Sequence, residues 1–189
     1  MNATDTAREY HAADNLLAGR NILITGAGAG IGRALALACS RLGATVILVG
    51  RTVAKLEAVY DEIEQAGGPQ PAIIPLDLAS AAEAELRAVG EAVAGTFDCL
   101  HGLVHNAALL GDRQPMATTS YQGWLELMQT NVNAPMVITQ ALLPLLEAAE
   151  DASVIFTSSG VGRSGRAYWG AYATSKFANE GMMEVQIGR

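Results

Sequence analysis

A glycine-rich segment near the N-terminus constrains the fold more than any other part of the sequence. The segment TGAGAGIGR, 25–33, follows the apolar run NILIT and precedes residues with apolar side chains at helical spacing. This order predicts a buried strand, a tight turn and a helix. Gly26 permits the turn, Gly30 allows the backbone to approach a pyrophosphate, and Gly32 lets the helix pack closely on the sheet. The alternative is a turn that only connects a strand to a helix.

The rest of the chain repeats this alternation of apolar runs and helical patterns. Strands are expected at 21–25, 45–49, 72–76, 100–105 and 153–157, and helices at 31–42, 53–65, 80–93, 121–148 and from 168 onward. Thr52 and Ser80 are expected helix N-caps, and a bend in the long helix is expected near Pro135 or Pro144. Continuously apolar strands alternating with helices predict an α/β fold of Rossmann type. It is a doubly wound parallel sheet between two helical layers.

Composition and charge exclude several functional classes. The 189 residues carry a net charge of −7 and no basic cluster, which is inconsistent with general binding to nucleic acids or membrane surfaces. The apolar runs are too short to span a bilayer, and the N-terminus lacks the pattern of a secretory signal, so a cytoplasmic protein is expected. Cys39 and Cys99 are expected to be buried free thiols. No histidine has a partner at metal-ligand spacing, and His105 is expected to pack at a strand end.

A second group of polar residues lies in the segment SSGVGRSGRAYWGAYATSKF, 158–177. Tyr172 and Lys176 are four residues apart, so both project from one face of a helix. A lysine ammonium favours the phenolate of a nearby tyrosine, which can then exchange a proton with a substrate oxygen. Ser159 and the neighbouring Ser158 lie upstream. Taken alone, a tyrosine and a lysine at this spacing would equally describe a solvent-exposed helix face.

Together, these motifs resemble the short-chain dehydrogenase/reductase family over nearly the whole chain. They occur in the family's order between the expected elements: TGxxxGxG, Asp77-Leu78, Asn106-Ala107-Ala108, Asn131 in QTNVNAP, then Ser159 and YxxxK. Ala108 stands where the family has glycine. Other segments, such as TQALLPLL and KFANEGMM, are similar to one group of bacterial oxidoreductases within the family.

The resemblance implies a reaction and a set of site residues. The reaction is reduction of a ketone or aldehyde, or oxidation of the alcohol, with hydride moving to or from a nicotinamide. Tyr172 would exchange the proton, Lys176 would also hold the nicotinamide ribose, and Ser159 would polarise the substrate carbonyl. Asn131 would position a water in a proton relay. Cofactor contacts are implied for Gly26, Gly28, Gly30, Ile31, Gly32, Asp77, Leu78, Asn106, Ala107, Tyr172 and Lys176.

The end of the second strand indicates which dinucleotide is bound. NAD-selective Rossmann folds usually carry an acidic residue there, which binds the ribose hydroxyls. This chain has Gly50 followed by Arg51, so a guanidinium is available to pair with a 2′-phosphate. We predict NADP(H) rather than NAD(H), with Arg51 as a cofactor contact and Arg33 as a possible second cation. The alternative for Arg51 is a solvated charge at a strand end.

We expect an N-terminal arm over 1–18 and one dinucleotide-binding domain over 19–189. The family implies a homodimer or homotetramer. Relatives continue with further strands, a Pro-Gly turn and a substrate lid, so the resemblance implies a C-terminally truncated domain that lacks the usual last strands. Two other functions stay open. One is a truncated, non-catalytic dinucleotide-binding or oligomerisation module, and the other is a sugar-nucleotide epimerase or dehydratase, which has YxxxK but usually TGxxGxxG spacing.

Overall fold

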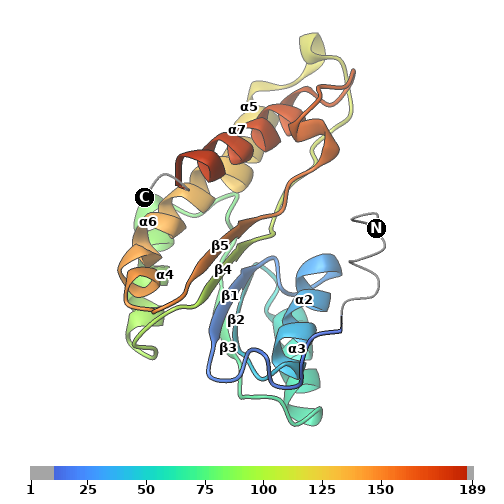
Figure 1. The fold of residues 1–189 in the computed structure, drawn as a ribbon. Helices are drawn as coiled ribbons and strands as arrows, with labels where there is room; N and C mark the ends of the chain where they lie inside the picture. Colours follow the sequence, from blue (N-terminus) through green and yellow to red (C-terminus); the bar gives the residue numbers. More distant parts are fainter. Residues whose placement is uncertain (1–10, 187–189) are drawn as a thin grey trace, which may run out of the picture.

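In the computed structural model, which describes residues 11–186, five parallel strands form one sheet with helices on both faces (Figure 1). The strands are β1 (Asn21–Thr25), β2 (Thr45–Gly50), β3 (Ala72–Pro75), β4 (Gly102–His105) and β5 (Ser153–Phe156). Their order across the sheet is β3-β2-β1-β4-β5. The predicted doubly wound Rossmann-type sheet is therefore confirmed. Its strand order reverses between β1 and β4, and ligands of such sheets bind at the carboxyl ends of strands at this point.

Helices form a layer on each face of the sheet. The α-helices are α2 (Gly30–Arg41), α3 (Val53–Gln65), α4 (Glu83–Ala94), α5 (Tyr121–Met128), α6 (Ala134–Glu147) and α7 (Gly170–Gln186). Two single-turn 3₁₀ segments, η1 (Met116–Thr118) and η3 (Gly160–Gly162), and a π-helical segment, η2 (Gln129–Asn133), complete the described elements. In Figure 1, α2 and α3 cover one face of the sheet, while α4, α6 and α7 lie on the other.

The core consists of two apolar clusters, one on each face of the sheet. Side chains of β1 alternate between them, because Ile22 and Ile24 pack with α2 and α3 while Leu23 packs with α4 and α6. The strand β2 does the same with Val46 and Ile47. This two-sided burial explains why the strands read as continuous apolar runs instead of alternating patterns.

Two predicted helix boundaries are wrong for local reasons. Ser80 is not the N-cap of α4. The N-cap is Ala82, because the backbone forms a turn over the residues before Ala82. The carbonyl of Asp77 accepts from the amides of Ser80 and Ala81, which uses these residues in a turn. The last helix begins at Gly170, not at Tyr168, whose φ of +70° lies in the left-handed region.

The long helical pattern is divided into α5 and α6 by the π-helical segment η2, which ends just before the turn that contains Pro135. The bend near the prolines stays a prediction. Pro135 lies in the first turn of α6, directly after η2, and has no amide hydrogen to donate to a carbonyl of the preceding turn, while Pro144 lies inside α6. The π-helical segment contains Asn131, a predicted catalytic residue. Such π segments are frequent at functional sites.

The start of the described chain packs onto α2, and β5 lies at a sheet edge. The amide of Leu17 donates to the carbonyl of Leu42, and the Leu17 side chain contacts the cluster under α2 and α3. Residues 1–10 of the predicted 1–18 arm lie outside the described residues. Ile155 of β5 is 52% exposed, unlike the apolar residues of β1 and β2. Among the described residues, no helix is both long and apolar enough to cross a membrane.

Candidate active site

The glycines between β1 and α2 are required by close packing against the loop after β4. Gly26 has a φ of +69°, and a Cβ there would lie 3.0 Å from Ala107 Cα and from Asn106 Nδ2. A Cβ on Gly32 would lie 2.3 Å from the carbonyl oxygen of Gly26. Gly30 has a φ of +56°, and a Cβ there would meet no atom within 4 Å. Gly26 and Gly32 are therefore closely packed against neighbouring atoms, whereas the turn is open at Gly30, where a phosphate would approach.

The hydroxyl of Thr25 connects β1 to the loop that follows β4. Thr25 is 1% exposed, and its Oγ1 accepts from the amides of Asn106, at 3.0 Å, and Ala107, at 3.1 Å. The Asn106 carboxamide donates in turn to the Thr25 carbonyl at 3.1 Å. No role was predicted for Thr25. Its signal was a polar residue that ends an apolar strand directly before the first glycine.

A cavity of about 340 Å³ opens beside this turn. The ends of β2 and β3 and the loop after β4 complete its walls. Seven predicted cofactor residues line it: Gly26, Gly28, Arg51, Asp77, Leu78, Asn106 and Ala107. The others on the turn, Gly30, Ile31 and Gly32, lie at the start of α2 outside this lining. The α2 N-terminus has neither a side-chain cap nor an acidic residue in its first turn, so its amides and positive dipole end suit an anion.

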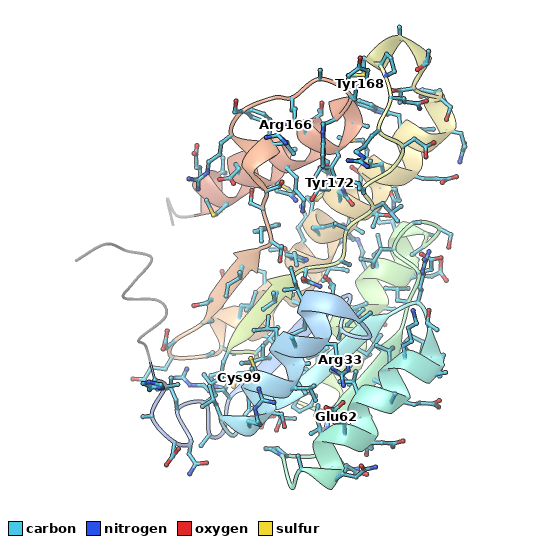
Figure 2. All side chains as sticks on the ribbon, turned by 90° about the vertical axis from the view of Figure 1, so that its right-hand side faces the viewer. Arg33, Glu62, Cys99, Arg166, Tyr168 and Tyr172 are labelled. Carbon is cyan, nitrogen blue, oxygen red and sulfur yellow. The ribbon has the colours of Figure 1, made fainter. Side chains whose placement is uncertain are left out.

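Two positive side chains line the cavity near the end of β2, of which Arg51 was predicted. Arg51 is exposed and lines the cavity, together with Lys55 in the first turn of α3, which sequence reasoning missed. The sequence feature that could have indicated Lys55 was its position four residues after Arg51. Arg33 does not line this cavity, because it forms an ion pair with Glu62 across α2 and α3 (Figure 2). Asp77 Oδ1 accepts from the amide of Ala79 at 3.1 Å, which fixes its loop.

Tyr172 and Lys176 lie next to each other on α7, and neither lines this cavity. The Lys176 ammonium is 5.5 Å from the centroid of the Tyr172 ring and donates to the carbonyl of Thr157, just after β5, at 2.5 Å. Lys176 is 3% exposed, and desolvation by burial lowers its pKa. Tyr172 is half-buried. The pair is therefore not a solvent-exposed helix face, since its cation is buried and fixed against the end of a strand.

The two candidate serines have different environments. Ser158 donates its hydroxyl hydrogen to the carboxylate of Glu180. Ser159 is the N-cap of η3, and its Oγ accepts from the amide of Val161 across 3.4 Å. The Ser159 hydroxyl hydrogen thus stays available for another acceptor, which agrees with the choice of Ser159 over Ser158.

Asn131 joins three elements through its buried carboxamide. Its Oδ1 accepts from the amide of Leu109 at 2.8 Å, and its Nδ2 donates to the Leu109 carbonyl at 2.9 Å and to Ser175 Oγ at 3.0 Å. Ser175 Oγ donates to the carbonyl of Tyr172. The carboxamide thus connects the loop after β4 with α7, and both of its polar atoms are bonded to protein groups.

The model of the family described as short chain dehydrogenase matches residues 20–186. The chain belongs to this family. An uncharacterized oxidoreductase, YciK, from Escherichia coli K12 is 49% identical over 176 residues, which cover 93% of this chain and 70% of that protein.

Solved structures of this family are closely similar to the chain. A short chain dehydrogenase from Salmonella enterica serovar Typhi is 50% identical with a TM-score of 0.91, covering 94% of this chain and 73% of that one. A putative short chain dehydrogenase from E. coli CFT073, solved in complex with NADPH, is 48% identical with a TM-score of 0.90. The match covers 93% of this chain and 73% of that one.

An aromatic and cationic cluster lies beside Tyr172 in this short-chain dehydrogenase. The ring centroids of Trp169 and Tyr172 are 6.0 Å apart, and the Arg113 guanidinium lies 5.6 Å from the Trp169 centroid. A Cβ on Gly170 would lie 3.0 Å from the Met116 side chain. The loop that carries Arg113 and η1 therefore packs against the start of α7.

The remaining candidate groups of the dehydrogenase are a histidine and two cysteines. His105 is 4% exposed, its Nε2 lies 2.8 Å from Thr139 Oγ1, and burial lowers its pKa to about 3, which confirms the expected packed histidine. Both cysteines are free; Cys39 is buried as predicted, but Cys99 is partly exposed, at a loop before β4 (Figure 2). Within residues 11–186, no group of three or more histidine, cysteine or acidic side chains is placed to hold a metal.

Proposed function

We propose that this short-chain dehydrogenase interconverts a carbonyl compound and its alcohol with NADP(H), and that Tyr172 exchanges the proton with the substrate oxygen. The observation that carries the proposal is the pair of Tyr172 and a buried Lys176 on one face of α7. The ammonium beside the phenol stabilises the phenolate that remains after proton transfer. A general acid of this kind lowers the barrier for carbonyl reduction.

The chain offers suitable groups for the adenine side, the pyrophosphate and the 2′-phosphate of NADP(H). The open turn at Gly30 and the uncapped N-terminus of α2 would hold the pyrophosphate, and Asp77 and Leu78 would contact the adenine side. Arg51 and Lys55 would hold the 2′-phosphate, where no acidic residue ends β2. Bound NADPH supplies the hydride. The similar E. coli structure solved with NADPH supports this choice of dinucleotide.

The other predicted catalytic residues would orient the reacting groups. Ser159 would donate its free hydroxyl hydrogen to the substrate carbonyl and so stabilise the developing negative charge. Asn131 would hold the substrate-side loop and α7 at a fixed spacing through Leu109 and Ser175. A relay water of the predicted kind would have to bind the backbone of η2, because the carboxamide atoms are engaged.

The Tyr172→Phe variant tests this function, with Tyr168→Phe as a matched control. Tyr168 is an exposed phenol on the same segment (Figure 2). Against a panel of ketones and aldehydes, we expect NADPH oxidation to fall at least about 100-fold in Tyr172→Phe and to persist in Tyr168→Phe. NADPH binding, followed by its fluorescence, is expected to be retained in both. Binding without any Tyr172-dependent turnover would favour the non-catalytic binding module instead.

The assembly and compartment expected from the resemblance are proposed as well. The proposal is a cytoplasmic homodimer or homotetramer acting on a small-molecule substrate. Sedimentation velocity at several protein concentrations tests the assembly, and cell fractionation tests the compartment. A monomer at all concentrations would contradict the first of these.

A further inference from the structure

Glu180 continues the face of α7 that carries Tyr172 and Lys176. The three residues follow each other at intervals of four, so they lie on successive turns of one helix face. The Glu180 side chain is only 15% exposed. It points to the segment between β5 and α7, because both of its carboxylate oxygens meet groups of that segment.

These two contacts enclose the turn that presents Ser159. One oxygen of Glu180 accepts the hydroxyl hydrogen of Ser158, directly before Ser159. The other oxygen lies 3.6 Å from the guanidinium of Arg163, the C-cap of η3. The hydrogen bond from Ser158, together with the Arg163 charge, lowers the pKa of Glu180, so the carboxylate is ionised at neutral pH. A single anion on α7 thus contacts residues on both sides of η3.

The turn that carries Ser159 needs contacts from outside to fix its conformation, because its own glycine-rich backbone restricts that conformation little. The sequence SSGVGRSG, 158–165, contains three glycines, which restrict backbone conformation little. Within η3, the amide of Gly162 donates to the carbonyl of Ser159 at 2.8 Å. A Cβ on Gly162 would lie 3.0 Å from Lys176 Cβ, so the turn packs directly on α7. The bond from Lys176 to Thr157 adds a further contact between α7 and this part of the chain, and Ser159 itself takes part in none of these contacts.

We propose that Glu180 is a positioning residue that fixes the Ser159 hydroxyl relative to Tyr172 and Lys176, acting through Ser158 and Arg163. The inference rests on the proposed function for its effect on turnover. Displacement of a reacting group by about 1 Å can cost about 100-fold in rate. Release of the turn therefore lowers turnover without removing any group that contacts the substrate.

A double-mutant cycle tests this role, with Glu184→Ala as a matched control. Glu184 is an exposed acid one turn further along α7. We expect Glu180→Ala to lower kcat about 10- to 100-fold, with the NADPH dissociation constant changed less than about 2-fold, because the cofactor cavity is lined by other elements. Glu180→Gln, whose carboxamide can still accept from Ser158, is expected to recover part of the loss. Glu184→Ala is expected to behave as the parent.

The cycle partner is Ser159→Ala. If Glu180 acts through Ser159, Glu180→Ala should reduce turnover little further in the Ser159→Ala background. Equal losses with and without the Ser159 hydroxyl would overturn the positioning role, as would full activity of Glu180→Ala.

Hydrogen exchange of the segment 158–166 gives a readout that needs no activity. We expect Glu180→Ala to accelerate exchange of the Gly162 amide about 10-fold or more relative to the parent and to Glu184→Ala. Unchanged exchange would overturn the anchoring of the turn, even if the chain had no turnover. Absence of Tyr172-dependent turnover with accelerated exchange would instead refute only the proposed function.

Discussion

The carbonyl oxygen of Gly26 lies so close to Gly32 that a Cβ at Gly32 would stand 2.3 Å away from it. The same Cβ would lie 2.6 Å from the carboxamide nitrogen of Asn106. One residue without a side chain thus lets three pieces of the fold meet: the end of β1, the first turn of α2 and the loop after β4. The proposed phosphate site exists because these pieces are in contact.

A methyl group at position 32 should therefore damage both the fold and the cofactor site. Because the atoms it meets are backbone and a fixed carboxamide, we expect Gly32→Ala to lower the free energy of unfolding by about 1–3 kcal/mol and to weaken NADPH binding. Urea denaturation and NADPH titration measure the two effects. As control, Gly181→Ala on α7 meets no atom within 4 Å and should stabilise the helix by up to about 1 kcal/mol. Equal stability of the two variants would contradict the packing argument.

The cations of the cavity should decide between NADPH and NADH. A charge-assisted hydrogen bond contributes about 1.5–3 kcal/mol, so we expect Arg51→Gln to weaken NADPH binding about 10- to 100-fold and to leave NADH binding nearly unchanged. Lys55→Gln should act in the same direction. Arg33→Gln is the matched control, because Arg33 pairs with Glu62 and does not line the cavity. Equal loss of affinity for both dinucleotides in Arg51→Gln would argue against a 2′-phosphate contact.

His105 should make the protein less stable at acidic pH. Its Nε2 donates to Thr139 Oγ1, whose own hydrogen goes to the Pro135 carbonyl, and its buried Nδ1 has no partner among the described residues. Burial lowers its pKa from 6.5 to about 3, so between these values the unfolded chain binds a proton that the folded chain does not. The contribution of neutral His105 to the free energy of unfolding is therefore fully present above pH 6.5. It is lost as the pH falls, at up to about 1.4 kcal/mol per pH unit.

The His105→Gln variant removes this titration but can still donate to Thr139. We expect its unfolding free energy to fall less steeply between pH 6.5 and pH 4 than that of the parent, as measured by urea denaturation at each pH. His11→Gln, at an exposed histidine, serves as the control and should follow the parent. Parallel curves for the parent and His105→Gln would contradict the assignment of a neutral, buried imidazole.

The order of elements and the chemistry of the motifs could be predicted because they depend on neighbours in sequence. Strand and helix periods, the glycine spacing and the interval from Tyr172 to Lys176 are all local patterns, and they led to the parallel sheet and to the short-chain dehydrogenase family. The helix over 53–65 was predicted with the bounds that α3 has. Helix ends set by a turn, such as that of α4 after Asp77, were placed less well.

Contacts between distant segments were decided only by the tertiary structure. Arg33 was a candidate cofactor cation from the sequence, but in the structure Glu62 of α3 lies beside it and forms an ion pair with it. Lys55 lines the cavity because α3 begins at the end of β2. The carboxamide of Asn131 is bonded to Leu109 and Ser175, which no local pattern indicates. Sequence determined which side chains this dehydrogenase has available. The packing of α7 on the segment after β5 decided that Lys176 is buried beside Tyr172 and that Glu180 contacts residues on both sides of η3, because such contacts form only when the sheet brings these segments together.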